Sequence, residues 1–144
     1  MPTRGRRPDV LVDTSVAVAL VVADHEHHVP TSEALAGRRL GLAGHAAFET
    51  YSVLTRLPPP ARRTPEVVSR LMAADFPESR FLSAGGARAL FEGLATLQIA
   101  GGSVYDALVG AAAAEHGLPL ATRDRRAVDA YRALGVGVEL LPER

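Results

Sequence analysis

Acidic residues stand alone inside otherwise uncharged segments of this chain. They are Asp13, Glu49, Asp106 and Asp124, and the first three are the only formal charges in residues 10–23, 40–55 and 99–114. Burying an ionised carboxylate costs several kcal/mol unless it is paired or bound to a metal. One divalent-cation site would explain all four acids together, because Mg²⁺ prefers oxygen ligands and takes one or two carboxylates directly, with waters held by the others.

The elements that must position these acids follow from hydrophobic patterning. Short apolar runs alternate with longer helical patterns, which is typical of an α/β domain with a largely parallel sheet. Strands are predicted over residues 9–13, 40–43, 79–82, 118–121 and 136–141. Helices are predicted over residues 15–22, 30–39, 46–57, 64–74, 83–100, 104–116 and 125–134.

This order of elements brings the acids to one edge of the sheet. Asp13 and Asp124 come at or just after the carboxyl ends of two predicted strands, where open α/β sheets form their ligand crevice. Asp106 shares a helix face with Ser103 and Gly110, whose small side chains would let the helix pack closely on the sheet. We therefore expect the Asp106 carboxylate to point inward.

Each acid also has a simpler structural interpretation. Asp13 and Asp124 could cap the helices that follow them. Glu49 could be a half-buried acid held by an arginine. Asp106 fits such an interpretation least well, because Asp is a poor helix former and gains nothing in an apolar helix interior without a partner.

Composition excludes several classes of chemistry. The 144 residues, 47% of them hydrophobic and 22% charged, predict one soluble globular domain over 1–144. The chain has no cysteine, which excludes disulfides, thiolate metal sites and cysteine nucleophiles. All 16 basic residues are arginine, so Walker A and Schiff-base chemistry are excluded as well. The 16 acidic residues cancel this charge, so overall charge does not indicate a nucleic-acid binder.

The beginning of the sequence is basic. Arg4, Arg6 and Arg7 precede an apolar stretch, but Asp9 and Asp13 interrupt it, so a secretory leader is not predicted. We expect residues 1–8 to form a flexible basic tail. No segment approaches the roughly 20 apolar residues that span a bilayer, which predicts a cytoplasmic protein with no membrane contact.

With these residues the chain resembles the PIN-domain ribonucleases, and specifically the VapC-type toxins of bacterial toxin–antitoxin pairs. The resemblance covers roughly residues 10–141. It depends on four motifs, which are Val12-Asp13-Thr14-Ser15, Phe48-Glu49, Gly101-Gly102-Ser103-Val104-Tyr105-Asp106-Ala107-Leu108 and Ala121-Thr122-Arg123-Asp124-Arg125-Arg126. The resemblance implies a three-layer α/β/α domain with a short, mainly parallel central sheet flanked by helices.

The resemblance also implies an active site. The family's acidic quartet falls on Asp13, Glu49, Asp106 and Asp124, all catalytic and metal-binding, with Asp13 and Asp106 as direct ligands of Mg²⁺ or Mn²⁺. Thr14 and Thr122 fall at the family's hydroxyl positions, which orient a carboxylate or a water. Family members often carry a basic residue where Ser103 stands, so this sequence departs from the pattern there. The implied activity is a toxin endoribonuclease that hydrolyses RNA phosphodiester bonds.

Arginines near the acids could bind the substrate. Arg123 and Arg126 flank Asp124, and guanidinium groups suit phosphate oxygens, although both could equally lie on a solvated helix face. They are the candidate RNA-binding residues.

Three other functions compete with this interpretation. The cluster Asp24-His25-Glu26-His27-His28 could hold zinc, but it has no matching distant ligands. A phosphatase could use Asp13 as its nucleophile, but its usual second Asp is replaced by Ser15, and no lysine is present to bind the phosphoryl group. The non-enzyme alternative is a catalytically inactive PIN-like module that binds RNA or a protein.

The family resemblance further implies a cognate VapB-like antitoxin and a homodimer. Two apolar groups support such partners, one of Leu90, Phe91, Leu94 and Leu97, and one of Phe48, Tyr51 and Leu54. We expect an amphipathic segment of the antitoxin to bind in such a groove, with a basic side chain that competes with the metal.

Overall fold

The computed structural model describes residues 9–142. Its strands are β1 (Val10–Val12), β2 (Leu40–Leu42), β3 (Leu120–Thr122) and β4 (Val138–Leu140). Its helices are α1 (Thr14–Val21), α2 (His28–Ala34), α3 (His45–Thr55), α4 (Pro65–Asp75), α5 (Ala84–Gly93), α6 (Ser103–His116) and α7 (Arg125–Ala133).

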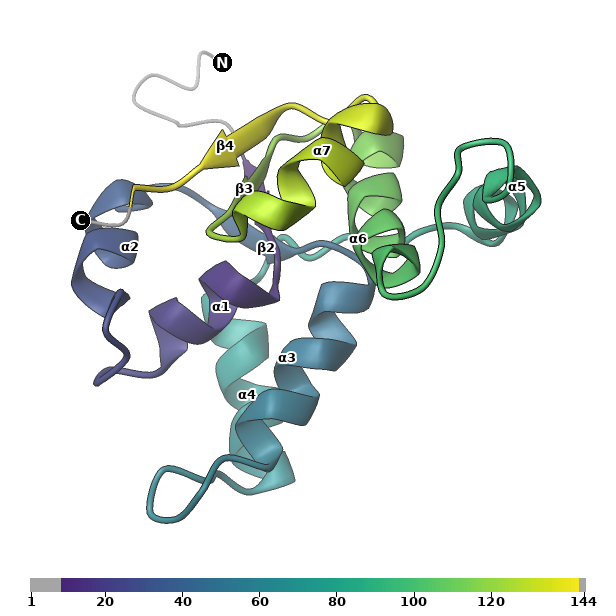
Figure 1. Cartoon of the computed structure of the whole chain (residues 1–144). Coiled ribbons are helices and arrows are strands. Elements are labelled where there is room, and N and C mark those ends of the chain that lie inside the picture. Colours follow the sequence, from purple (N-terminus) through teal and green to yellow (C-terminus); the bar gives the residue numbers. More distant parts are fainter. Residues whose placement is uncertain (1–8, 143–144) are drawn as a thin grey trace, which may run out of the picture.

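The four strands form one parallel sheet in the order β2-β1-β3-β4 (Figure 1). Val12 pairs with Leu42 of β2 on one side and with Ala121 of β3 on the other, so β1 is central. Because parallel strands end at the same edge, the chain segments after β1 and β3 emerge side by side. This edge is where the predicted acids Asp13 and Asp124 lie.

Two hydrophobic clusters cover the two faces of the sheet, as the alternation of side chains along β1 requires. Val10 and Val12 pack with residues of α1, α3 and α4 in one cluster. Leu11, between them in sequence, packs with residues of α6 and α7 in the other. The sheet is therefore the middle layer of an α/β/α domain, as predicted, and α5 packs on α6 outside these layers (Figure 1).

Capping residues fix the helix ends where the sequence predicts them. Thr64 accepts a hydrogen bond from Val67 N at the start of α4, and Ser83 accepts one from Gly86 N at the start of α5. Gly117 ends α6 in the left-handed conformation, with φ of 65°. These ends need only local chemistry, which is why sequence patterns identify them.

Three predicted elements differ from the structure. The strand expected over 79–82 is reduced to a single bridge between Ala43 and Arg80. The ladder is interrupted there because Leu42 N donates to Ser79 Oγ instead of a backbone carbonyl. The helix expected to continue to residue 100 ends at Gly93, and Leu94 and Leu97 lie in the turns that follow. The helix expected over 30–39 occupies His28–Ala34.

The predicted basic tail, residues 1–8, lies outside the described residues. Across residues 9–142, none of the helices combines the length and the apolar character that crossing a membrane would require.

Gly41 of β2 gives the first testable prediction. A Cβ atom at this position would lie 2.1 Å from the Glu78 carbonyl oxygen, because the backbone of residues 78–79 crosses directly over it. We expect Gly41→Ala to lower the free energy of unfolding by about 2 to 3 kcal/mol through overpacking. The measurement is urea unfolding.

The matched control is Gly85→Ala in α5, where a Cβ atom would meet no atom within 4 Å. This change should stabilise the chain slightly, because alanine loses less backbone entropy in a helix. Equal effects of the two substitutions would contradict the close approach at Gly41.

Candidate active site

The four isolated acids surround one hollow at the carboxyl edge of the sheet. Asp13 follows β1 and Asp124 follows β3, while Glu49 lies on α3 and Asp106 on α6. The hollow has a volume of about 100 Å³, and it is lined by Asp13, Thr14, Ser15, Glu49, Asp106, Val109, Asp124 and Tyr131. A wider hollow of about 690 Å³ shares Glu49, Asp106 and Asp124 and opens toward α3 and the start of α6. The structure thus brings together the four residues that the sequence singled out.

Asp13 is the deepest of the four, with 5% of its surface exposed. Its Oδ1 atom accepts hydrogen bonds from Ser15 Oγ at 2.6 Å and Val16 N at 3.2 Å. Its Oδ2 atom accepts from Thr122 Oγ1 at 2.5 Å and Tyr131 Oη at 2.9 Å. Burial raises the pKa of Asp13 above its usual range, and these four donors oppose that rise by stabilising the charged form.

Tyr131 and Ser15 are site residues that the sequence analysis did not select. Burial, and then the charge of Asp13, raise the pKa of the Tyr131 phenol, so its hydroxyl stays protonated and donates. Tyr131 is the polar member of the buried face of α7, beside Ala127 and Val128. That pattern looks like core packing, and only its hydroxyl group on an apolar face could have signalled a second role.

Thr122 connects the two strand-end acids. Its Oγ1 atom donates to Asp13 and accepts a hydrogen bond from Asp124 N at 3.0 Å. Asp124 in turn caps α7, since its Oδ1 atom accepts from Arg126 N at 3.0 Å. Asp13 likewise caps α1 through Val16 N. The capping interpretation therefore holds for both acids, and both also line the hollow.

The Asp106 carboxylate is repelled by the other three acids of the hollow. Burial raises its pKa, and the charges of Asp124, Asp13 and Glu49 raise it further. Arg126 lowers it, but this effect is the smallest. The hollow therefore carries more negative charge than the neighbouring arginine compensates.

The remaining predicted residues, Thr14, Arg123 and Arg126, lie at different places around the hollow. Thr14 lines the hollow, and its hydroxyl donates to the Ala46 carbonyl at 3.5 Å, the outer limit of a hydrogen bond. Arg123 binds Thr31 Oγ1 and the Pro142 carbonyl through Nη1, so its guanidinium group holds the C-terminal segment. The Arg126 side chain is 93% exposed and lies 3.4 Å from Asp124.

The donor set fits a hard cation. All four acids offer carboxylate oxygens, and their repulsion would be relieved by positive charge in the hollow. As the side chains stand, no three His, Asp or Glu residues within 9–142 converge as ligands of one ion. Mg²⁺ suits this wider spacing, because it usually keeps several waters and binds one or two carboxylates directly.

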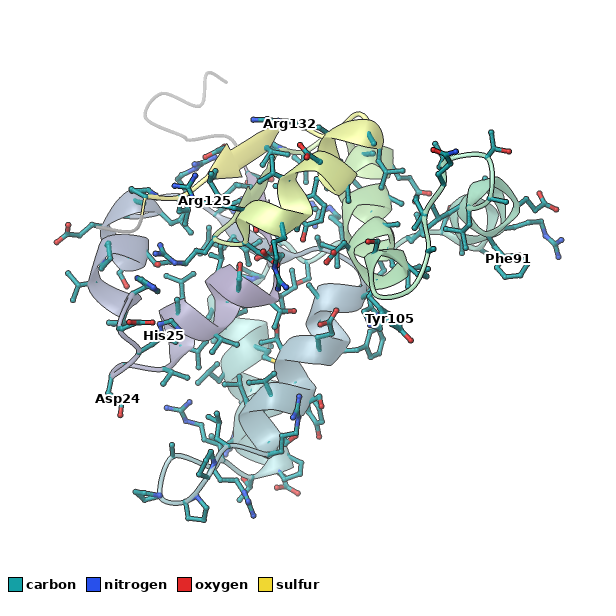
Figure 2. The ribbon with its side chains drawn as sticks, viewed as in Figure 1. Asp24, His25, Phe91, Tyr105, Arg125 and Arg132 are labelled. Carbon is teal, nitrogen blue, oxygen red and sulfur yellow. The ribbon has the colours of Figure 1, made fainter. Side chains whose placement is uncertain are left out.

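The histidine cluster lies beside the acids. His25 and His27 line a separate hollow of about 400 Å³ that shares Thr14 and Ser15 with the acidic one. The rings of His25 and His27 are 5.7 Å apart, and Figure 2 shows His25 on the segment after α1. His28 does not line this hollow and forms a hydrogen bond with the Ala19 carbonyl at 2.9 Å. The three imidazoles therefore do not face one common point.

Comparisons with known proteins place this chain in a family. The model of the PIN domain family matches residues 10–133. The chain is 48% identical over 132 residues to ribonuclease VapC27 of Mycobacterium tuberculosis, covering 92% of this chain and 96% of the relative. It is also 48% identical over 131 residues to ribonuclease VapC40 of the same organism, covering 90% and 96%. The chain belongs to the PIN domain family.

Solved structures agree on the fold. The chain is similar to the crystal structure of M. tuberculosis VapC20, a toxin that cleaves the sarcin-ricin loop, with a TM-score of 0.68 and 20% identity over 93% of this chain and all of that one. It is also similar to FitAB bound to an IR36 DNA fragment, with a TM-score of 0.63 and 17% identity over 91% and 94%. At these identities the likeness shows the fold alone.

Removing the Asp106 charge should change how stability depends on pH. The raised pKa means that the folded chain holds this proton to higher pH than the unfolded chain does, so stability falls as pH rises from the ordinary value of 3.8 through the raised one. In chelator, we expect Asp106→Asn to be more stable than the native chain at about pH 7, with the gap closing toward about pH 4. Urea unfolding across this range measures the gap.

Asp129→Asn is the control, because Asp129 is exposed on α7 and does not line the hollow. A gap for Asp106→Asn that stays constant with pH would contradict the repulsion at the site.

Proposed function

We propose that this chain is a metal-dependent endoribonuclease that acts as the toxin of a toxin–antitoxin pair. The observation that carries the proposal is the ring of four carboxylates at the carboxyl edge of the sheet. The 48% identity to ribonucleases VapC27 and VapC40 supports it, because the identity extends over nine-tenths of the chain. A ribonuclease of this kind acts where cellular RNA is, so we place it in the cytoplasm.

The carboxylates Asp13, Glu49, Asp106 and Asp124 would hold Mg²⁺ or Mn²⁺. A bound divalent ion supplies positive charge for the phosphate and lowers the pKa of water, so no amino-acid nucleophile is needed. Without that charge an RNA phosphate would be repelled, because the repulsion that raises the pKa of Asp106 acts on any anion in the hollow.

The residues of the chain then have separate tasks. Ser15, Thr122 and Tyr131 fix both oxygens of Asp13, which keeps its carboxylate in one orientation. Glu49 is less tightly held than Asp13: its side chain is 43% exposed, and among the ion pairs of the described residues it pairs with His45 at 3.5 Å. Because it lines both hollows, its carboxylate would be the one to accept a proton from an attacking water. Arg126, at the rim, can bind a phosphate oxygen of the substrate.

The alternatives fit the geometry less well. An aspartyl phosphatase usually has a second aspartate two residues after its nucleophile and a lysine that binds the phosphoryl group, whereas here Ser15 stands at that position and donates to Asp13, and the chain has no lysine. An inactive binding module would have no reason to keep four repelling acids around one hollow, because each unpaired charge lowers stability.

The direct test is metal-dependent cleavage of total RNA by variants of the acids. Asp13→Asn and Asp106→Asn should each lower the cleavage rate by more than about 100-fold at saturating Mg²⁺, since even outer residues of metal sites contribute about 10- to 100-fold. Asp129→Asn, on the exposed face of α7, should cleave like the native chain. Cleavage by either site variant near the native rate would remove that residue from the metal site.

Thermal melting separates loss of metal from loss of fold. Mg²⁺ or Mn²⁺ should raise the Tm of the native chain in a saturable way, because it binds the folded state alone. The same titration should leave the Tm of Asp106→Asn unchanged. Identical melts of the native chain with metal and with chelator, together with no RNA cleavage, would favour the inactive module.

We further propose that the chain forms a homodimer and binds a VapB-like antitoxin. The supporting surface is an apolar hollow of about 610 Å³ between α5 and α6, which includes Leu90, Phe91 and Leu94. Phe91 is 76% exposed and points outward from α5 in Figure 2. Leu54, expected in the second apolar group, is instead fully buried in the core, whereas Phe48 and Tyr51 are exposed. A basic antitoxin side chain entering the acidic hollow would compete with the metal.

Light scattering tests self-association. The native chain should be a dimer, and Phe91→Glu should shift it toward the monomer, because a charge in an apolar interface stays unpaired. Val67→Glu is the control, since Val67 is 40% exposed on α4, away from this hollow. A native chain that remains monomeric at high concentration would contradict the dimer.

A further inference from the structure

Four aromatic rings form a row on the surface beside the acidic hollow. The ring of His45 stacks on that of Tyr105, with centroids 5.2 Å apart and an interplanar angle of 25°. Phe48 continues the row, with its ring 6.5 Å from His45, and Phe81 packs edge-on against Phe48 at 6.1 Å. We call these four residues the aromatic row. Figure 2 shows Tyr105 where the start of α6 approaches α3.

The aromatic row is exposed to solvent, so packing in the protein interior does not account for its aromatic side chains. Phe48 is 66% exposed, Tyr105 54% and Phe81 51%. Contiguous exposed apolar surface commonly marks a binding site. Ring edges and faces that stack on one another while open to solvent are suited to accept another flat ring.

The aromatic row is continuous with the proposed catalytic hollow. His45 and Tyr105 line the same 690 Å³ hollow as Glu49, Asp106 and Asp124. Chain connectivity fixes this proximity, because Tyr105 is adjacent to Asp106 in sequence and His45 lies one helical turn before Glu49. If a phosphate of the substrate lies at the acids, the groups next to that phosphate therefore contact the His45 and Tyr105 rings. Arg126 lines this hollow too and offers a positive charge to a further phosphate.

We propose that His45, Tyr105 and Phe48 form a stacking platform for an unpaired base of single-stranded RNA next to the phosphate that is cleaved. The proposal builds on the ribonuclease function above. Aromatic side chains stack on any base, so the platform supplies affinity and holds the strand, and it requires the base to be unpaired.

Kinetics with substitutions at Tyr105 test the platform. Tyr105→Leu keeps an apolar side chain but removes the ring, and Tyr105→Phe is the matched control that keeps it. With a single-stranded oligoribonucleotide as substrate, we expect Tyr105→Leu to raise KM roughly tenfold, within the about 5- to 150-fold that a lost base stack costs. Tyr105→Phe should stay within about twofold of the native chain, because the hydroxyl contributes nothing to stacking.

Fluorescence gives a second readout that does not require cleavage. The chain has no tryptophan, so Tyr105→Trp carries a single reporter in the platform. At saturating Mg²⁺, and before appreciable cleavage has occurred, its emission should be quenched by oligoadenylate, and an abasic oligoribonucleotide of the same length should leave it unchanged. Circular dichroism of each variant establishes that it is folded.

The outcomes distinguish this inference from the proposed function. If the native chain cleaves RNA while the Leu and Phe variants share one KM and the reporter ignores oligoadenylate, the platform is wrong and the ribonuclease stands. If the tryptophan emission changes with protein concentration and not with RNA, the platform is also wrong. The aromatic row would then be a contact between two copies of the chain. A native chain that neither cleaves nor binds RNA overturns both proposals.

Discussion

One buried negative charge organises the centre of this protein. Asp13 ends the central strand β1 with both carboxylate oxygens inside the fold, where an unsatisfied acceptor would cost several kcal/mol. Its four donors come from three parts of the chain, the start of α1, the end of β3 and the last turn of α7. These segments must be in place together for the charge to be tolerated. The parallel order of β1 and β3 and the packing of α7 on them are therefore requirements of the site as much as of the core.

Asp13 is stabilised by its donors, whereas Asp106 beside it is destabilised by its neighbours. Asp106 receives repulsion from three carboxylates and only a small opposing effect from Arg126. A sequence selected for stability alone would replace such a group, because folds tolerate local conflicts mainly where function requires them. All four acids line the hollow, but among the described residues Asp13 is held by four hydrogen bonds and the other three by fewer, an arrangement that would suit a site that exchanges water, cation and substrate while one carboxylate stays fixed.

Much of this arrangement is predictable from sequence because it depends on local chemistry and on a general rule of sheet geometry. An acid alone in an apolar segment is conspicuous, and parallel strands deliver their following residues to one edge. Tyr131 and Ser15 were missed because their roles depend on contacts across the fold, and a tyrosine on a buried helix face looks like packing. The interrupted strand at 79–82 was missed for a similar reason, whereas nothing among the described residues explains why α5 ends at Gly93. A single side-chain hydrogen bond, from Leu42 N to Ser79, interrupts a pattern that hydrophobicity alone would continue.

The charge imbalance also connects the proposed catalysis with its proposed control. Any cation that enters the acidic hollow relieves the same repulsion, whether it is a divalent metal or a guanidinium group of the proposed antitoxin. Two such cations would repel each other in a space of about 100 Å³, so their binding is competitive. The electrostatic repulsion among the acids therefore favours binding of the metal and binding of a basic inhibitor alike, and each weakens the binding of the other. Arg126 is exposed, pairs with Asp124 at 3.4 Å and does not line the smaller hollow that contains Asp13, so the four acids there remain available to an external cation.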